Sequence, residues 1–331
     1  MAADDQHAIV VIGASAGGVE SLTQLVRDLP AELPAAVAVV LHLPPSATSV
    51  LPSILNRSGA LPALAATDGE AVAPGRIYVA PPDHHLIVGP GELTLSHGPT
   101  ENGHRPAIDT TFRTAALSYG PRAIGVVLSG TLDDGAAGLA VIKDHGGTTV
   151  VQTPDDAAYR GMPEAALAAT EVDRVLPVRA IGAELVRLTG GPEPLPASPG
   201  PPPDPLPESA MPDDTATGLI CPECGGALWS LEESGVHRFR CRIGHAFSEE
   251  ALLDLQGGDV EAALWTALRA LEERSALLRR MAERARTGGS GGIAAGFLDK
   301  ALDIERQAEI VRAGVLPLSV HVVPDEENLA S

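Results

Sequence analysis

The strongest constraint on the fold is an alternation of two patterns along the first 190 residues. The runs at residues 8–12, 36–43 and 123–128 are apolar at both alternating positions, which is typical of strands covered on both faces of a sheet. Helical patterns, for example at residues 19–29 and 136–143, follow such runs. The alternation predicts an α/β fold with a doubly wound, mainly parallel sheet and helices on both of its faces.

A proline-rich segment divides the chain. Ten of the 21 residues at 192–212 are proline, and Lys and Arg are absent there, so we expect an extended linker over residues 191–217. The chain has 331 residues, about twice the usual size of one domain. We therefore predict an α/β domain at residues 1–190 and smaller units after the linker.

The overall charge argues against two kinds of partner. The chain carries 43 acidic and 23 basic residues, a formal net charge of -20, which opposes binding to nucleic acid and to anionic membrane surfaces. Its first seven residues do not resemble a secretion signal, and no apolar stretch of about 18 residues occurs, so we expect a soluble cytoplasmic protein without membrane insertion. The chain has only three cysteines, an odd number, which argues against a disulfide framework.

The loop after the first apolar run carries the first candidate site. Residues 13–18 read Gly-Ala-Ser-Ala-Gly-Gly and contain the pattern G-x-S-x-G, which lifts a serine hydroxyl out of a sharp turn between a strand and a helix. A dinucleotide-binding loop would need glycine at the position of Ser15. A structural turn with a capping serine is a third interpretation.

Two further side chains are expected at the same edge of the sheet. His42 ends the second apolar run, and Asp134 follows the third, with Asp133 competing for its role. A strand-end histidine and a helix-capping aspartate are the structural alternatives. Because ligands bind at the carboxyl edge of open α/β sheets, serine, histidine and aspartate together there favour a serine hydrolase.

These residues lie in longer segments that resemble the catalytic domain of bacterial chemotaxis protein-glutamate methylesterases. The resemblance covers roughly residues 8–190. It rests on VIGASAGGVESL at 11–22, LHLPP at 41–45, RIYVAPPDHHL at 76–86, HRPAIDTTF at 104–112 and VVLSGTLDDGAAGL at 126–139.

The resemblance implies a role for each candidate residue. Ser15 would be the nucleophile, His42 the general base and Asp134 the residue that orients the imidazole. The backbone N–H of Ala16 would stabilise the oxyanion, and Thr131 stands where the family often has methionine, which affects the shape of the pocket. The implied reaction hydrolyses glutamate methyl esters on chemoreceptor helices, and also some receptor glutamines, without a catalytic cofactor.

Regulation is expected to differ from that of the best-known family members. Those members carry an N-terminal receiver domain, whereas only seven residues precede the first strand here. We therefore expect no receiver domain, and an enzyme that is either constitutively open or controlled by its C-terminal half or by a partner such as a cognate methyltransferase. A non-catalytic signalling scaffold on the same fold is the alternative function.

The segment after the linker carries a metal-binding pattern. Cys221 and Cys224 form C-x2-C, and Cys241 and His245 form C-x3-H sixteen residues later. Two close ligand pairs separated by the length of a hairpin predict one structural Zn²⁺ in a zinc-ribbon-like module at residues 218–257. His237 is the alternative fourth ligand.

The sequence after residue 257 predicts a helical hairpin over residues 258–316, followed by a flexible tail at 317–331. The expected helices span residues 259–286 and 293–312. The apolar stripe on the first helix comprises Val260, Leu264, Ala267, Leu268, Leu271, Leu278 and Met281. We expect this hairpin to mediate homodimerisation or receptor recruitment.

Two further pairs of residues complete the set of candidates. The adjacent His84 and His85 would point to opposite faces of a strand and would therefore not share a metal ion. Arg105 and Asp109 would either border the pocket or form a surface ion pair.

Overall fold

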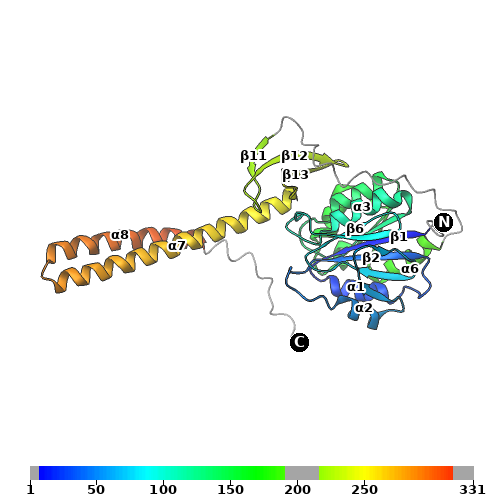
Figure 1. Cartoon of the computed structure of the whole chain (residues 1–331), viewed down its shortest axis with the longest axis horizontal. Coiled ribbons are helices and arrows are strands. Elements are labelled where there is room, and N and C mark those ends of the chain that lie inside the picture. The colour runs from blue at the N-terminus through cyan, green and yellow to red at the C-terminus, as the bar shows by residue number, and fades with distance from the viewer. Residues whose placement is uncertain (1–6, 191–215, 316–331) are drawn as a thin grey trace. The chain divides into compact units, whose positions relative to one another are not determined.

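The computed structural model describes residues 7–190 and 216–315 (Figure 1). The predicted tail, and the predicted linker up to residue 215, lie outside these ranges. The linker prediction ends too late, because residues 216 and 217 already belong to a strand. The chain divides into two compact units, Met1–Leu252 and Leu253–Ser331.

The first unit is built on a seven-stranded sheet in which every neighbouring pair is parallel. The strand order is β10-β9-β8-β1-β2-β5-β3, so β1 lies in the middle between β2 and β8. This confirms the predicted α/β fold. The strands are β1 (Ala8–Ala14), β2 (Ala35–Leu41), β3 (Ala63–Ala65), β5 (Arg76–Val79), β8 (Ala123–Val127), β9 (Thr148–Gln152) and β10 (Arg174–Leu176).

Helices cover both faces of this sheet (Figure 1). On one face lie α1 (Gly18–Val26), α2 (Leu51–Ser58) and α6 (Val178–Thr189). On the other lie α3 (Ile108–Tyr119), α4 (Ala136–Asp144) and α5 (Gly161–Ala169). Two short 3₁₀ helices, η1 (Gly120–Arg122) and η2 (Pro154–Asp156), and a small antiparallel sheet of β4 (Glu70–Ala71), β7 (Glu92–Ser96) and β6 (His85–Val88) complete the domain.

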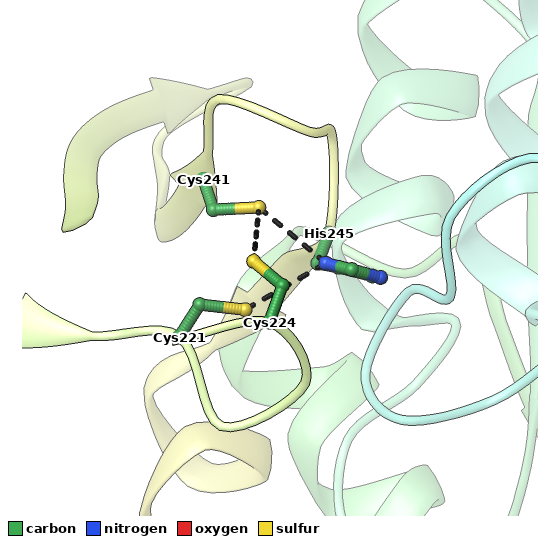
Figure 2. A group of neighbouring side chains, drawn as sticks. All are labelled: Cys221, Cys224, Cys241 and His245. Carbon is green, nitrogen blue, oxygen red and sulfur yellow. Dashed lines mark hydrogen bonds between the residues drawn. The ribbon is translucent and has the colours of Figure 1, made fainter. Parts of the chain in front are cut away.

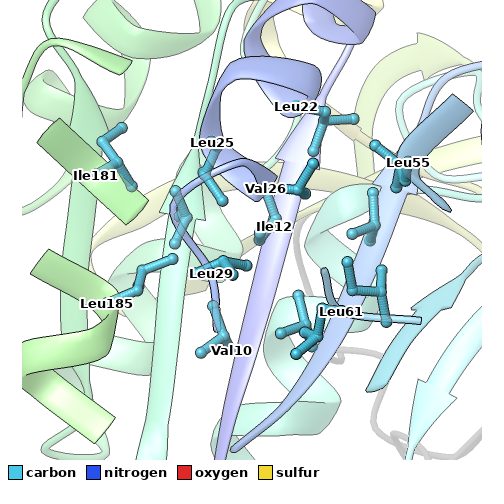
Figure 3. Packing of buried hydrophobic residues seen from close by; sticks show 14 of the residues in the cluster. Val10, Ile12, Leu22, Leu25, Val26, Leu29, Leu55, Leu61, Ile181 and Leu185 are labelled. Atoms are coloured by element: carbon cyan, nitrogen blue, oxygen red, sulfur yellow. The ribbon is translucent and has the colours of Figure 1, made fainter. Parts of the chain in front are cut away.

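The core explains why the central strands are apolar at every position. Val10 and Ile12 of β1 pack with α1, α2 and α6, as Figure 3 shows, whereas Ile9 and Val11 belong to a second cluster with α3, α4 and α5. All four side chains are fully buried. Burial of each such side chain contributes about 1.5 to 3 kcal/mol, so the residues that face either side of the sheet stabilise the fold.

The Cys3His module, residues 216–248, forms a separate four-stranded antiparallel sheet. Its strands are β11 (Ala216–Ile220), β12 (Ala227–Glu233), β13 (Val236–Cys241) and β14 (Ala246–Ser248). Ser234 and Gly235 join β12 to β13 with φ of 50° and 78°, as a tight hairpin turn requires. β12 and β13 form a hairpin between the two ligand pairs, and β11 and β14 extend it to four strands.

Two helices, α7 (Glu249–Thr287) and α8 (Gly291–Val315), follow the module. The prediction that the first helix starts at residue 259 is wrong, because α7 begins ten residues earlier. The Ser248 hydroxyl accepts a hydrogen bond from the Ala251 backbone N–H (3.0 Å) and so caps the new N-terminus. Gly257 and Gly258, directly before the predicted start, lie within the helix.

Within the second unit, α7 and α8 pack through small and apolar side chains. Leu268, Ala282, Ala301, Ile304 and Ala308 are buried. The Ser275 hydroxyl donates to Glu305 at 2.6 Å, and Arg279 pairs with the same carboxylate at 2.7 Å. The predicted stripe is partly wrong, because three of its members are exposed: Val260, Ala267 and Met281.

A search of the described helices for one long and apolar enough to cross a membrane finds none.

Candidate functional site

The candidate catalytic residues come from the carboxyl ends of three adjacent strands. β1 pairs with β2 through Ala14 and Leu41, and the next residues are Ser15 and His42. β8 pairs with β1 on its other side and leads into the loop that carries Asp134. The strand order therefore brings together three side chains that are up to 119 positions apart in the sequence (134 − 15).

The three side chains form a continuous hydrogen-bonded relay. His42 Nδ1 lies 3.1 Å from Ser15 Oγ, and His42 Nε2 lies 2.7 Å from Asp134 Oδ2. The side chains of His42 and Asp134 are 7 % and 2 % exposed. An imidazole that carries its proton on Nε2 donates to Asp134 and leaves Nδ1 free to accept the serine proton. The ring nitrogens are thus used in the opposite order to those of chymotrypsin-type triads.

Asp134 is fixed by more than the histidine. Its carboxylate accepts the backbone N–H groups of Ile108 (2.7 Å) and Asp109 (3.2 Å) and the side-chain amide of Asn102 (3.0 Å). Burial would raise the pKa of Asp134, but the hydrogen bond from His42, the charge of the imidazole and the Ile108 N–H hold it well below its usual range. The carboxylate therefore stays ionised and can stabilise an imidazolium.

The structural alternative for Asp134, a cap on the helix that follows it, is not what the structure shows. Asp134 precedes α4 but binds the first turn of α3. Asp109, in the first turn of α3, instead accepts the Gly135 and Gly138 N–H groups of α4, at 3.0 and 2.7 Å. Each carboxyl group thus accepts backbone N–H groups at the N-terminus of the other helix, which ties the two helices together.

The nucleophile loop is held against the β8 loop. Ser15 N–H donates to Ser129 O (3.0 Å), and the Ser129 hydroxyl donates to Ala16 O (2.8 Å). Gly17 has φ of 69°, and a Cβ at Gly130 would lie 2.9 Å from Ser15 Cβ. Glycine is needed at these two positions because the turn is left-handed at one and the backbones approach closely at the other.

A second histidine borders the relay. The His104 ring stacks on His42 with 3.7 Å between ring centroids. Burial and the neighbouring His42 lower the pKa of His104 to about 4, while Asp134 acts in the opposite direction. His104 is therefore neutral at pH 7 and confines the plane of the His42 ring without adding charge.

A cavity of about 330 Å³ opens beside His42. Its lining includes Pro44, Thr100, His104 and Arg105. Arg105 thus borders the cavity, and it forms an ion pair with Asp83 (2.6 Å) rather than with Asp109. Asp109 itself is 1 % exposed and lies behind Asp134 rather than at a surface.

Ala16 and Thr131 belong to the loops that follow β1 and β8. Ala16 directly follows the nucleophile before the N-terminus of α1, and its carbonyl is oriented by Ser129. Thr131 is exposed, and Leu132 after it has φ of 57°. The peptide at Gly130 is tied to α5 by the Met162 N–H (2.9 Å), which fixes the wall nearest Ser15.

The predicted metal ligands converge in the Cys3His module, as Figure 2 shows. His245 Nδ1 lies 3.7 Å from Cys221 Sγ and 3.5 Å from Cys241 Sγ, and the Cys224 and Cys241 sulfurs are 3.7 Å apart. Tetrahedral Zn²⁺ places thiolate and imidazole ligand atoms about 3.5 to 3.8 Å apart, given bonds of roughly 2.3 and 2.0 Å. The four side chains therefore fit a closed structural site.

The other histidines considered from the sequence are engaged elsewhere. His237 contacts Ser230 Oγ (2.5 Å) and pairs with Glu249 (2.8 Å), so the structure does not bring it to the cysteines. His84 Nδ1 lies 3.1 Å from Pro82 O, whereas His85 is buried with Nε2 2.9 Å from Pro99 O. The two adjacent rings thus contact different carbonyl groups.

Sequence reasoning missed Asn102, Ser129 and His104. Ser129 and His104 lie within segments that carry the family resemblance, so position in those segments was an available signal. Asn102 had only a weak signal, an Asn-Gly dipeptide of the kind that favours turns, and its φ of 53° agrees with that.

Comparison with known proteins assigns the family. Residues 10–185, more than half of the chain, match the family model described as CheB methylesterase. The chain belongs to the CheB methylesterase family.

Individual relatives agree with this assignment. A protein-glutamate methylesterase/protein-glutamine glutaminase of Anaeromyxobacter dehalogenans is 42 % identical over 181 residues, covering 55 % of this chain and 53 % of that protein. The protein-glutamate methylesterase FrzG of Myxococcus xanthus is 38 % identical over 182 residues, covering 55 % and 54 %. The chain spans about half the length of the curated relatives it matches.

A solved structure shows the same domain. The CheB methylesterase catalytic domain of Thermotoga maritima is 36 % identical and superposes with a TM-score of 0.53, covering 55 % of this chain and 98 % of that one. The Cys3His module and the helical hairpin lie outside the residues that match the family model.

Proposed function

We propose that this protein hydrolyses methyl esters of glutamate side chains in chemoreceptors, releasing methanol and restoring a carboxylate. The observation that carries the proposal is the relay from Ser15 through His42 to Asp134 at the carboxyl edge of the sheet. The names of its relatives support the substrate, since they are protein-glutamate methylesterases. Those that are also named protein-glutamine glutaminases support deamidation as a second reaction of the same site.

In the first step, Ser15 Oγ attacks the ester carbonyl while His42 Nδ1 takes the serine proton. The ionised Asp134 stabilises the imidazolium that results. Collapse of the tetrahedral intermediate breaks the bond to the methoxy oxygen, and His42 returns the proton to that oxygen as methanol leaves. The glutamyl group remains as an ester of Ser15.

In the second step, water attacks the acyl group with His42 again as the base. Ser15 recovers its proton, and the glutamate carboxylate is released. In both steps negative charge develops on the former carbonyl oxygen, and we assign the Ala16 N–H as the donor that stabilises it, with Thr131 as a pocket residue. Loss of one such donor typically costs about 10² to 10³ in kcat.

The cavity beside His42 is the proposed entry for the receptor side chain. Its polar lining from Thr100 and Arg105 suits a substrate that carries an ester or amide and becomes a carboxylate. The partner we propose is therefore a methylated receptor helix, and the enzyme that supplies its substrate is a glutamate methyltransferase.

The four converging ligands of the Cys3His module are proposed to bind one structural Zn²⁺. Its chemistry is ligation alone, because three thiolates and one imidazole leave no open position for a catalytic water. No step of ester hydrolysis uses the metal.

The catalytic proposal is tested by methanol release from a methylated chemoreceptor preparation. Ser15→Ala should reduce the rate at least about 10⁴-fold, as expected for loss of a nucleophile. Ser53→Ala, an exposed serine on α2, is the matched control and should retain full activity. Equal rates for wild type and Ser15→Ala would disprove the mechanism, and a serine-reactive phosphonate that labels wild type at Ser15 would support it.

A further inference from the structure

The Cys3His module contacts the catalytic domain directly behind the catalytic aspartate. The carbonyl of Ala246 in β14 accepts the Asn102 N–H (2.8 Å), and the Ser248 N–H donates to Asn102 Oδ1 (2.9 Å). The Ser248 hydroxyl donates to Asp133 at 2.7 Å. Asn102 therefore lies between the module and Asp134.

These contacts determine which way the Asn102 amide points. Its Nδ2 donates to Asp134 Oδ1 and to Asp109 Oδ2, each at 3.0 Å. A reversed amide would present its NH2 group to the Ser248 N–H and its oxygen to two carboxylates. The backbone N–H of the module thus keeps the amide in the one orientation that supports Asp134.

Arg238 of β13 brings a positive charge to a group of acidic side chains beside Asn102. It is 1 % exposed, and its guanidinium lies 2.5 Å from Glu101, 3.5 Å from Asp109 and 3.0 Å from Glu233. Arg113 of α3 pairs with Glu101 (2.7 Å) and Glu233 (2.5 Å) from the other side. The network joins the module to α3 through charges that are largely buried, and Arg238 is the most buried of the cations, so its loss leaves buried acidic groups without a partner.

The electrostatics of Asp109 depend on this arginine. Burial raises the pKa of Asp109 to about 8, and Arg238 is the main influence in the opposite direction. Without Arg238, Asp109 would be held still further toward its neutral form. Its hydrogen bonds to Asn102 and to the N-terminus of α4 would then weaken.

We infer that the Cys3His module is an internal positioning element for the active site, in which Arg238 and Ser248 act through Asn102 to hold Asp134. Asp134 keeps its bonds to His42 and to two backbone N–H groups when the module is perturbed. The expected loss of activity is therefore partial. The inference rests on the proposed esterase activity for its main readout.

The experiment compares the full-length wild type with Arg238→Met and Asn102→Gly. Glycine is chosen at 102 because φ there is 53°, so the variant removes the amide without backbone strain. Each variant should lower kcat about 10- to 100-fold with KM changed less than about threefold, and the rate of phosphonate labelling at Ser15 should fall in parallel. Arg242→Met, an exposed arginine of the same module, is the control and should match the wild type.

The double variant tests whether the two residues act together. The kcat of the double variant Arg238→Met/Asn102→Gly should be at most about threefold lower than that of the slower single variant. Both substitutions remove the same support of Asp134, so their effects should not add. Zinc content should stay near that of the wild type in Asn102→Gly, which separates positioning from unfolding of the module. Restoration of part of kcat by Arg238→Lys would support the charge argument.

The outcomes distinguish the two proposals. A folded wild type that releases no methanol would overturn the proposed function. An active wild type, together with variants that keep its kcat and labelling rate, would overturn the positioning role alone. A change in KM alone, with kcat unchanged, would also overturn the positioning role, because the module would then act on substrate binding.

Discussion

The catalytic domain and the Cys3His module are both built around sheets, but different forces hold them together. The parallel sheet buries two apolar clusters, one on each face. The module buries few large apolar side chains, among them Leu228, Phe239 and Phe247, and places four ligand side chains at one end of its strands. A sheet that buries this little needs a second source of stability, which we propose is metal ligation.

The two regions should therefore lose their structure under different treatments. Substitution within an apolar cluster should reduce the stability of the catalytic domain whether or not metal is present. Removal of the metal should affect the module first and reach the active site only through Arg238, Ser248 and Asn102.

The largest expected effect lies within the catalytic domain and discriminates between adjacent aspartates. Asp134→Asn should lower kcat by about 10⁴-fold, because the amide no longer favours the imidazole tautomer that accepts the serine proton. Asp133→Asn should stay within about threefold of wild type, since an amide oxygen can still accept the Ser248 hydroxyl. Methanol release measured for both variants checks this, and a reversed ranking would mean that Asp133 orients His42.

Metal removal is expected to have the next largest effect and to separate the two regions. Chelation, or Cys221→Ser, should unfold the module while the parallel sheet keeps its structure, and kcat should fall about 10- to 100-fold through the lost support of Asn102. Zinc analysis, circular dichroism and hydrogen exchange across β12, β13 and the central strands measure this. Simultaneous loss of protection from hydrogen exchange in both sheets would contradict the prediction that only the module depends on metal.

A core substitution probes the region that does not depend on metal. Leu25→Ala should reduce the free energy of unfolding of the catalytic domain by about 2 to 5 kcal/mol, because Leu25 is fully buried in the cluster of Figure 3. Leu277→Ala, on an exposed position of α7, should change the unfolding free energy by less than about 0.5 kcal/mol. Denaturant titration with and without chelator should give the same loss for Leu25→Ala.

The smallest effect concerns pH and the contact between the regions. Burial raises the pKa of Asp133 to about 6, against the opposing hydrogen bond from Ser248. The group binds its proton more tightly when folded, so the stability it contributes is present below about pH 4 and is lost as pH rises through 6. Asp133→Asn should therefore be more stable than wild type above pH 6, by at most about 2 to 3 kcal/mol, and equal to it below pH 4.

Thermal unfolding of both proteins between pH 4 and 8 measures this difference. A constant difference across that range would mean that Asp133 does not titrate between pH 4 and 6.

Local patterns predicted much of the site. Ser15, His42 and Asp134 could be identified because each follows an apolar run, and the carboxyl ends of neighbouring parallel strands meet at one edge. The four metal ligands could be identified because their spacing matches two ligand pairs joined by a hairpin. The start of α7 could not be identified, because the cap on its N-terminus comes from a serine of β14.

The contacts of Asn102, Asp109 and Arg238 were not predictable in this way. They join residues 101–113 to residues 233–248, and nothing local in either segment specifies the other. Such contacts form only when two separately folded sheets present complementary charges and unpaired backbone groups to each other.

By itself, the sequence determined the parallel sheet, the order of Ser, His and Asp along its edge, and the spacing of the metal ligands. These depend on burial periodicity and on chain connectivity, and both can be read from residues that are close together in the sequence. Only the tertiary structure decided that Asp134 caps α3 rather than α4, and that a segment more than 100 residues away lies against its support. The physical reason is that a buried polar group must find a partner wherever the packed elements supply one, and that choice is made in three dimensions.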